Sequence, residues 1–240
     1  MIIGYDYEIW QKYHIRNILQ IELSSHLSLL LTGSSGSGKS YALKFLIDKL
    51  LEDNIALTFC NFKNSEDFKF LKSYEQYYTF TSCGDGLNDF YRDFKEVQSA
   101  DTEFGGLYHI LVFDEFPAFI MSTTMTDKKL AEEYKRMIAE ILMLGRSYGF
   151  GVWLVMQRPD SSFLSNGARD NFHTTISLGN LSKEAKSMLY SGEELPDIIY
   201  KTGEGICWID GIGLKTIKFP RISDMQALEN RILNRLQARP

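Results

Sequence analysis

Short apolar runs alternate with segments of helical periodicity along most of the chain. The apolar runs predict buried strands at 26–32, 55–60, 77–82, 108–113, 151–156 and 173–178. Between them, apolar residues spaced three and four apart predict helices over 40–52, around 87–97 and over 127–144. Two late runs, 205–209 and 215–219, predict a hairpin. Ser223 with Gln226 predicts a capping box that begins a C-terminal helix.

This alternation of strands and helices defines the fold class. Because helices fall between the strands, we expect an α/β fold with a mostly parallel sheet covered by helices on both faces. A chain of 240 residues, 44% of them hydrophobic, can bury one sizeable core. We therefore expect a single domain over 1–240, with an N-terminal extension over 1–25, a core over 26–220 and a C-terminal helix over 221–240.

Charge and cysteine content narrow the class of protein. A net charge of −5 argues against a broadly basic protein that coats DNA, but it allows a few basic residues that line a channel. Cys60, Cys83 and Cys207 are widely spaced and form no zinc motif, which indicates buried free thiols in a reducing compartment. The sequence shows no signal peptide and no run of about 18 apolar residues. The expected location is the cytoplasm, and any recruitment to a membrane would need a partner.

The segment after the 26–32 run carries a phosphate-binding motif. It fits GxxxxGK[ST] and lies between a predicted strand and a predicted helix, which is the context that the motif requires. Lys39 is expected to reach the β- and γ-phosphates of ATP, and the Ser40 hydroxyl to bind Mg²⁺. A flexible glycine- and serine-rich loop is the alternative interpretation. The predicted nucleotide-binding residues are Gly33, Ser34, Ser35, Gly36, Ser37, Gly38, Lys39, Ser40 and Tyr41.

Two adjacent carboxylates follow the apolar run at 108–113. In P-loop ATPases the first acid of such a pair holds Mg²⁺ and the second polarises the attacking water. Both tasks need the carboxyl end of a strand, where the ligand crevice of an open α/β sheet lies. We therefore assign Asp114 to the metal and Glu115 to the water as general base. A strand that simply ends in solvated acids is the alternative.

A polar amide ends the run at 151–156. If this strand neighbours the strand of the acidic pair, Gln157 lies beside Glu115 and can bind the γ-phosphate or the attacking water. A polar strand end that faces solvent is the alternative. The candidate catalytic residues from the strand ends are thus Glu115 and Gln157.

Four segments together resemble the FtsK/SpoIIIE motor domain of the FtsK–HerA superfamily, which includes conjugative coupling proteins. They are HLSLLLTGSSGSGKS, ILVFDEF, GRSYGFGVWLVMQRPD and GEGICWIDG. The run from Gly145 to Gly149, followed by Gln157-Arg158-Pro159, is similar to the family's GR–x–x–G segment and TQRP motif. Asn61-Phe62-Lys63 is similar to the family's DPK motif, with Asn in place of Asp. The resemblance covers about residues 26–220.

The resemblance implies a RecA-like core, a hexameric ring, double-stranded DNA threaded through that ring and ATP bound between subunits. By the same match, Arg146 is expected to act in trans as an arginine finger, and Arg158 is a second candidate. A surface charge at a helix end is the alternative for Arg146. The sequence shows neither the family's membrane-spanning region nor its winged-helix DNA reader. We therefore expect a partner, such as a relaxase or a membrane anchor, to supply the target.

Loops that face a ring's channel are expected to carry a few cations for the DNA backbone. The segments 122–136 and 160–171 qualify, and they offer Lys128, Lys129 and Arg169 as DNA contacts. Glu132 and Glu133 neighbour the lysines, so a solvated helix face is the alternative.

Three other functions stay open from the sequence alone. A protein-secretion ATPase of the same superfamily would have a similar motor core and a different cargo. A small-molecule kinase would need an arginine-bearing lid, and the region 180–201 contains lysines but no arginine. A non-catalytic nucleotide switch would not need the complete set of catalytic residues. The leading interpretation is an ATP-hydrolysing motor that moves double-stranded DNA, with ATP and Mg²⁺ as cofactors.

Overall fold

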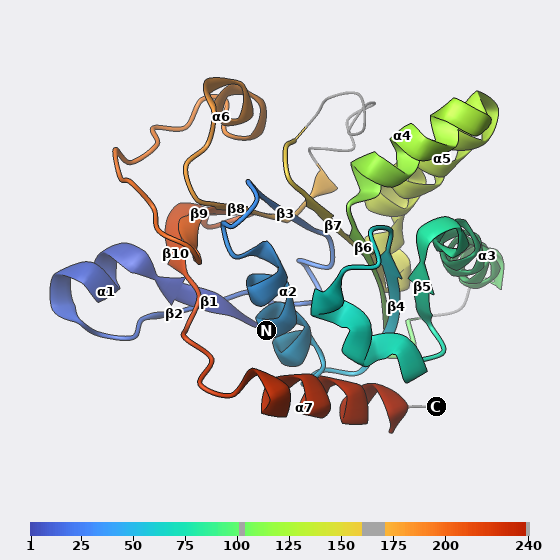
Figure 1. Ribbon diagram of the computed structural model, residues 1–240, viewed down its shortest axis with the longest axis horizontal. Coiled ribbons are helices and arrows are strands. Elements are labelled where there is room, and N and C mark those ends of the chain that lie inside the picture. The colour runs from blue at the N-terminus through green and yellow to red at the C-terminus, as the bar shows by residue number, and fades with distance from the viewer. Residues whose placement is uncertain (101–103, 160–170, 239–240) are drawn as a thin grey trace.

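The computed structural model describes residues 1–100, 104–159 and 171–238, and Figure 1 shows their arrangement around one mixed sheet. The strand order is β2-β1-β10-β9-β8-β3-β7-β6-β4-β5. The strands are β1 (Ile2–Asp6), β2 (Ile18–Gln20), β3 (Leu29–Gly33), β4 (Ile55–Asn61), β5 (Tyr77–Thr79), β6 (Tyr108–Asp114), β7 (Phe150–Met156), β8 (Thr174–Leu178), β9 (Glu204–Ile209) and β10 (Gly213–Lys218).

The strands from β8 to β5 in this order run parallel, and β9, β10, β1 and β2 join antiparallel. β3 is buried along its whole length because helices cover both faces of the sheet there. Its side chains alternate between the two faces. Leu29 and Leu31 enter one hydrophobic cluster, and Leu30 enters another. The mostly parallel sheet and the β9–β10 hairpin that the sequence predicts are confirmed.

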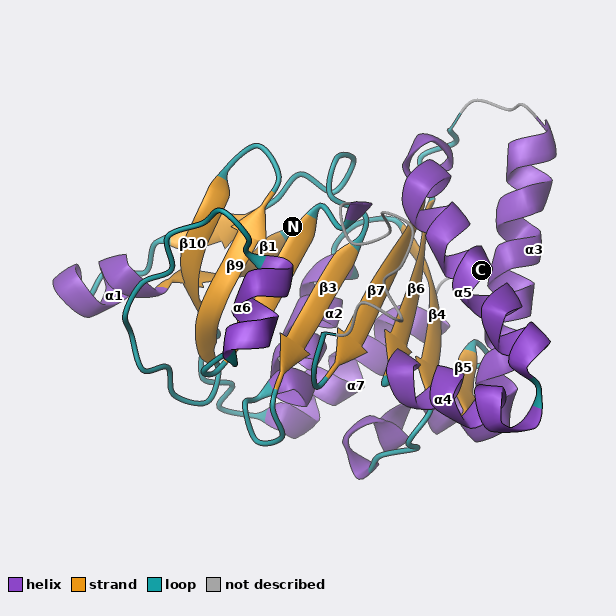
Figure 2. Ribbon diagram, turned by 90° about the horizontal axis from the view of Figure 1, so that it is seen from above, coloured by secondary structure: helices purple, strands orange, loops and turns teal. Residues whose placement is uncertain are grey.

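Helices lie on both faces of this sheet (Figure 2). Side chains of α2 and α7 pack in the cluster of Leu29, and those of α3, α4 and α5 pack in the cluster of Leu30. The helices are α1 (Tyr7–Tyr13), α2 (Lys39–Leu50), α3 (Cys83–Ala100), α4 (Phe116–Thr126), α5 (Lys128–Leu144), α6 (Lys183–Leu189) and α7 (Met225–Gln237). Three 3₁₀ segments are η1 (Glu66–Ser73), η2 (Phe80–Ser82) and η3 (Gly145–Tyr148).

Within the first 25 residues, β1 and β2 belong to the sheet, which the sequence pattern did not predict. β1 pairs with β10 and β2 pairs with β1, so this segment extends the sheet beyond the hairpin. Asp6 ends β1 and begins α1, since its Oδ1 accepts from the backbone N–H of Ile9 at 3.1 Å. Strands of three and five residues are too short to give a readable alternation.

Three other boundaries differ from the prediction. The expected strand over 77–82 ends at Thr79, because Phe80 takes a left-handed backbone angle, φ 49°, and opens η2. The residue that caps α7 is Asp224 rather than Ser223, since the Asp224 carboxylate accepts from Ala227 N–H at 2.9 Å. The stretch directly after the acidic pair forms α4, which the sequence pattern did not predict.

The three cysteines are as the sequence predicts. Cys60, Cys83 and Cys207 are buried free thiols. No helix in the described ranges combines the length and the apolar character needed to cross a membrane.

Candidate functional site

The phosphate loop connects β3 to the first turn of α2, as predicted. Gly38 precedes that turn with φ 96°, a left-handed angle that side chains rarely adopt. A Cβ at this position would also lie 3.0 Å from the backbone nitrogen of Gly203. The loop therefore needs glycine there, and the N-terminus of α2 directs its free N–H groups toward the space in front of the loop.

Lys39 lies at the centre of this loop. Its Nζ donates to the carbonyl oxygens of Gly33 and Ser34, at 2.6 and 3.1 Å. Burial lowers the pKa of Lys39, and the nearby charges of Glu115 and Asp114 oppose that shift. The loop follows β3 and the acidic pair lies at the end of β6, and β7 lies between these parallel strands, so both are at the carboxyl ends of the strands.

The acidic pair occupies the carboxyl end of β6. Asp114 is the last residue of that strand, and Glu115 begins α4 with a left-handed φ of 63°. The Glu115 N–H donates to the carbonyl of Val155 on the neighbouring β7 at 2.9 Å, which ties the turn to the sheet. Burial raises the pKa of Asp114 to about 7, and the Glu115 charge adds to the shift, while Lys39 and Lys63 counter it.

Gln157 lies one residue beyond β7, next to β6, as the sequence predicts. Its Nε2 donates to Oε1 of Glu115 at 3.0 Å. The Lys63 ammonium group pairs with the same oxygen at 2.8 Å, and no role for Lys63 was predicted. The signal for it was present in the Asn61-Phe62-Lys63 segment. That segment follows β4, which lies on the other side of β6.

A second loop supports the phosphate loop from outside. The Thr202 hydroxyl donates to the carbonyl of Gly36 at 3.2 Å, and the Gly203 N–H donates to the carbonyl of Ser37 at 2.9 Å. The sequence analysis missed this contact, because hydrogen bonds between distant loops leave no local pattern. The side chain of Tyr41 turns aside, since its hydroxyl donates to the Pro220 carbonyl at 3.0 Å.

Arg146 lies near the amino ends of the parallel strands, whereas the phosphate loop lies at their carboxyl ends. It is exposed in η3, which precedes β7, so it stands at the amino end of that strand. Its charge also contributes to the lowered pKa of His173, which directly precedes β8, although burial is the larger cause. The structure thus does not bring Arg146 to the phosphate loop of its own chain.

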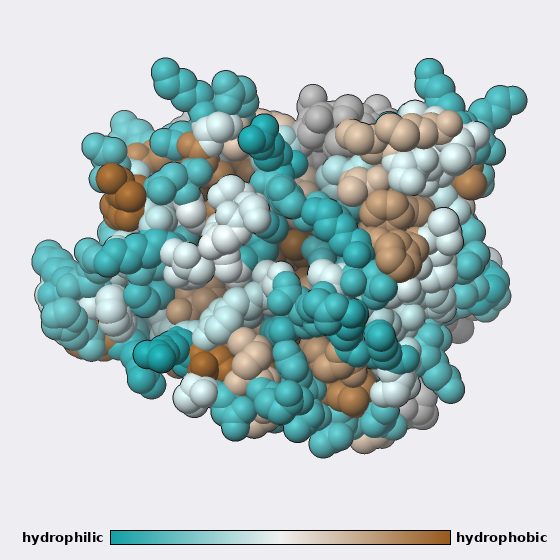
Figure 3. All heavy atoms as spheres, viewed as in Figure 1, coloured by the Kyte–Doolittle hydropathy of each residue, from teal (hydrophilic) through white to brown (hydrophobic). Residues whose placement is uncertain are grey.

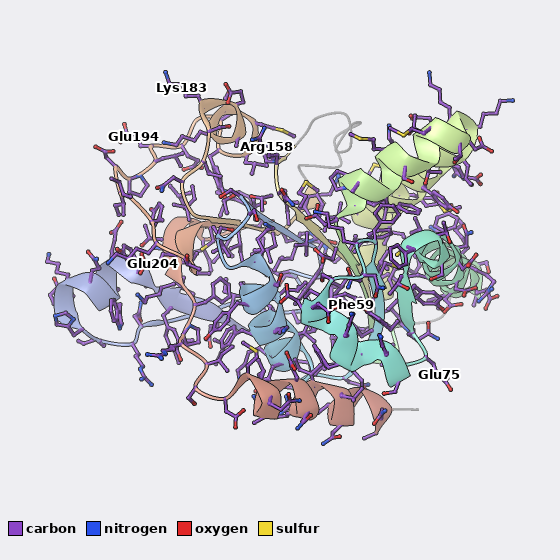
Figure 4. All side chains as sticks on the ribbon, in the orientation of Figure 1. Phe59, Glu75, Arg158, Lys183, Glu194 and Glu204 are labelled. Carbon is purple, nitrogen blue, oxygen red and sulfur yellow. The ribbon has the colours of Figure 1, made fainter. Side chains whose placement is uncertain are left out.

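Arg158 stands at the other end of β7, two residues beyond its last residue. Figure 4 shows it near α6, the helix from which Lys183 projects. The positive charge of Arg158 contributes to the lowered pKa of Glu184 on that helix, after two larger hydrogen-bond effects. Arg158 therefore lies at the carboxyl end of β7, on the side where α6 lies.

The proposed DNA contacts fall on different parts of the structure. The segment 122–136 was expected to face a ring's channel, with a helix beginning at 127, and it forms the end of α4 and the first half of α5. Lys128 and Lys129 are exposed in the first turn of α5. Figure 3 shows apolar colouring over the α4 region, where Met121 and Met125 are 55% and 80% exposed. Arg169 lies outside the described residues.

The site fits a magnesium ion by its donors. Mg²⁺ prefers oxygen ligands and usually takes one or two carboxylates together with waters and substrate phosphates. Asp114 and the Ser40 hydroxyl are such oxygen donors. Burial keeps Asp114 partly protonated near neutral pH, and a cation beside it would favour the charged carboxylate. No cluster of three or more His, Cys, Asp or Glu side chains exists among the described residues, so an all-protein metal cage is not found there.

The comparisons with known proteins agree with this geometry. No family model matches the chain. The FtsK domain-containing protein YdcQ of Bacillus subtilis (strain 168) is 28% identical over 192 residues, which is 74% of this chain and 39% of that protein. This chain thus spans well under half the length of its curated relative.

Solved structures match nearly the whole chain. ATPases 2 and 3 of EssC from Geobacillus thermodenitrificans superpose with a TM-score of 0.71 at 16% identity, over 99% of this chain and 48% of that one. The pCW3 conjugation coupling protein TcpA, solved as a monomer with ATPγS, superposes with a TM-score of 0.71 at 19% identity, over 98% and 69%. At such identities these structures establish the fold.

The sheet topology and the phosphate loop are those of P-loop ATPases with a RecA-like fold. Within that class, the similarity to YdcQ confirms the resemblance to FtsK motor domains that the motifs indicate.

Proposed function

We propose that this chain hydrolyses ATP and uses the energy to move double-stranded DNA. The observation that carries the first part is the meeting of the Lys39 loop, the Asp114–Glu115 pair and Gln157 at one edge of the sheet. The resemblance to FtsK motor domains supports the second part. A ring of identical subunits is the proposed active form.

The proposed reaction is in-line hydrolysis of the terminal phosphate. A water oxygen forms a bond to the γ-phosphorus while the bond from that phosphorus to the bridging oxygen breaks. The electron pair leaves with ADP, and Glu115 accepts a proton of the attacking water. Gln157 orients that water through its amide, and Lys39 binds the β- and γ-phosphates. When bound by Ser40 and Asp114, Mg²⁺ would neutralise phosphate charge.

In this proposal the α4–α5 hairpin contacts DNA. Lys128 and Lys129 are exposed near the connection of the two helices. By contrast, Lys135 and Arg136 form ion pairs with glutamates on the same helix. Glu132 and Glu133, the neighbouring acids that the sequence suggested, thus pair with Lys135 and Arg136. The first-turn lysines remain suited to backbone phosphates.

A protein-secretion ATPase is the second candidate. EssC is a secretion ATPase, and its structure favours this candidate. It superposes on as much of this chain as TcpA does, with the same TM-score. Motor cores of this fold do not reveal their cargo, so an experiment on the cargo is needed to separate the two candidates.

The decisive measurement is the ATPase rate with and without long duplex DNA, across a range of protein concentrations. We expect duplex DNA to raise turnover several-fold, and Lys128→Glu with Lys129→Glu to reduce that increase. Lys72→Glu, an exposed lysine of η1, is the matched control for charge reversal. If assembled rings hydrolyse ATP at the same rate with and without DNA, the DNA motor is wrong and the secretion ATPase gains support.

The chemical part is tested separately with Glu115→Gln. The substitution removes the general base and keeps the size of the side chain, so turnover is expected to fall by at least about a hundredfold. Binding of ATPγS should persist, because the phosphate loop is unchanged. A variant that still hydrolyses ATP at the normal rate would remove Glu115 from the mechanism.

A further inference from the structure

Lys63 forms one ion pair in the described part of the chain, and its partner is the proposed general base. The ammonium group lies 2.8 Å from Oε1 of Glu115. The Glu115 side chain is 13% exposed and that of Lys63 is 45% exposed, so the pair lies at the mouth of the site rather than in the core. Lys63 follows the end of β4, which runs parallel to the strand of the acidic pair.

This pairing conflicts with the task of a general base. The same oxygen of Glu115 accepts from Gln157 at 3.0 Å and from Lys63 at 2.8 Å. Both donors therefore engage one carboxylate oxygen of the proposed base, Oε1.

The surroundings of Lys63 point to what would release it. Lys63 and Lys39 both lie beyond the carboxyl ends of parallel strands, β4 and β3, and the Lys63 charge contributes to the lowered pKa of Lys39, after burial as the main cause. Lys39 itself is turned back onto the carbonyls of Gly33 and Ser34. A terminal phosphate in front of the loop would carry more negative charge than one carboxylate. It would therefore compete for both cations.

We propose that Lys63 is a positioning residue that holds Glu115 when the terminal phosphate is absent and transfers to that phosphate when ATP binds. Glu115 then keeps only its Gln157 contact, and its carboxylate is released from the ion pair toward the attacking water. Lys63 thus releases the carboxylate only when a terminal phosphate is bound. This inference rests on the proposed ATPase function, and it adds a selectivity for triphosphate over diphosphate.

The first test measures the affinities of ATPγS and ADP for the full chain, each with Mg²⁺. Lys63→Met should weaken ATPγS binding roughly three- to tenfold and leave ADP binding unchanged, because only the triphosphate offers the partner. Lys63→Arg keeps a positive charge and should retain the preference. Lys69→Met is the matched control, since Lys69 lies on the following η1 segment and pairs with Glu66.

The second test is a double-mutant cycle with Glu115→Gln. Glu115→Gln removes the charge that competes for Lys63, so it should strengthen ATPγS binding. The gain should be at least about threefold larger with Lys63 present than in the Lys63→Met background. The same cycle measured with ADP should show no coupling.

Two outcomes overturn the inference. One is an equal loss of ATPγS and ADP affinity in Lys63→Met, which indicates a general structural role. The other is an equal gain from Glu115→Gln in both backgrounds. These are binding measurements, so they stand apart from the failure of DNA-dependent turnover. Circular dichroism of each variant confirms folding, and Lys63→Gln repeats the test if Lys63→Met does not fold.

Discussion

Glu115 takes a left-handed backbone conformation that residues other than glycine seldom adopt. A left-handed residue of this kind costs about 1–2 kcal/mol, and the fold tolerates it here because the Glu115 N–H is bound to β7. The turn places the carboxylate against Gln157 and Lys63 at the mouth of the site. Strain at this residue is therefore associated with its position in the site, as is common at functional sites.

His109 gives a prediction about pH at the residue scale. It is half-buried on β6, its ring stacks on Phe150 with centroids 4.4 Å apart, and burial lowers its pKa although Asp93 opposes the shift. The unfolded chain therefore binds a proton at a higher pH than the folded chain does. The stability contributed by neutral His109 is present above pH 6.5 and is lost as pH falls toward the lowered pKa.

His109→Phe keeps the stacked aromatic pair and removes the titration. We expect thermal unfolding of the variant and the wild type to be similar at pH 8, and the variant to be the more stable of the two at pH 5.5. Urea unfolding at the same two pH values gives the corresponding free energies. A difference in stability that does not change with pH would contradict the prediction.

Asp48 gives a prediction at the scale of elements, because it joins α2 to α7. Its buried carboxylate accepts from Arg231 Nε and Nη2 at 2.7 and 3.0 Å and from Arg235 Nη1 at 3.2 Å. Asp48→Ala removes all three bonds. Since the arginines are partly exposed, we expect a loss of about 1–3 kcal/mol in the free energy of unfolding, measured in urea.

The matched control for Asp48 is Glu52→Ala on the turn after the same helix. Glu52 is exposed and pairs with Lys49 at 2.5 Å. Exposed pairs of this kind contribute little, so we expect a change within about 0.5 kcal/mol. Equal losses in the two variants would mean that the contact between α2 and α7 does not depend on Asp48.

The elements that the sequence predicted have strong internal signals. β3, β6 and β7 are apolar runs buried on both faces, and α5 has six buried residues at helical spacing. The missed elements have weak ones. β1 and β2 are too short to show the alternation of a strand. α4 has apolar side chains on its exposed side as well, including Met121 and Met125, so its residues do not show a helical period.

The site was predictable where chemistry is local in sequence. The phosphate loop and the Asp114–Glu115 pair are motifs of adjacent residues, and strand order then brings Gln157 to them. Lys63 and Thr202 come from distant segments, and only the folded chain brings them to the site. The roles of Arg146 and Tyr41 stay predictions, because the Arg146 side chain is remote from the loop and the Tyr41 hydroxyl is bound to Pro220.

At the scale of the whole molecule, the phosphate loop and Arg146 lie at opposite ends of the parallel strands. If Arg146 acts on ATP, it must act on a site of a neighbouring protomer. Arg146→Ala and Glu115→Gln should each be nearly inactive alone. Mixing the two should restore turnover, since a protomer with an intact base can then meet a neighbour with an intact arginine; random pairing completes about one quarter of the sites.

The mixing prediction is checked by titrating one variant with the other at constant total protein. Activity should pass through a maximum near equal amounts. As the control, each variant is mixed with Lys39→Ala, which should rescue Arg146→Ala but not Glu115→Gln, since the latter still lacks an intact site. No recovery in any mixture would mean that Arg146 does not act between protomers.

The bonds from Thr202 and Gly203 to the phosphate loop have a practical consequence. Ile199 lies three residues before Thr202, and its side chain is 85% exposed. A fluorophore attached through a cysteine at this position would stand in water, on the segment that leads directly to the loop. Its emission could follow nucleotide arrival and departure in real time while every residue of the phosphate loop stays intact.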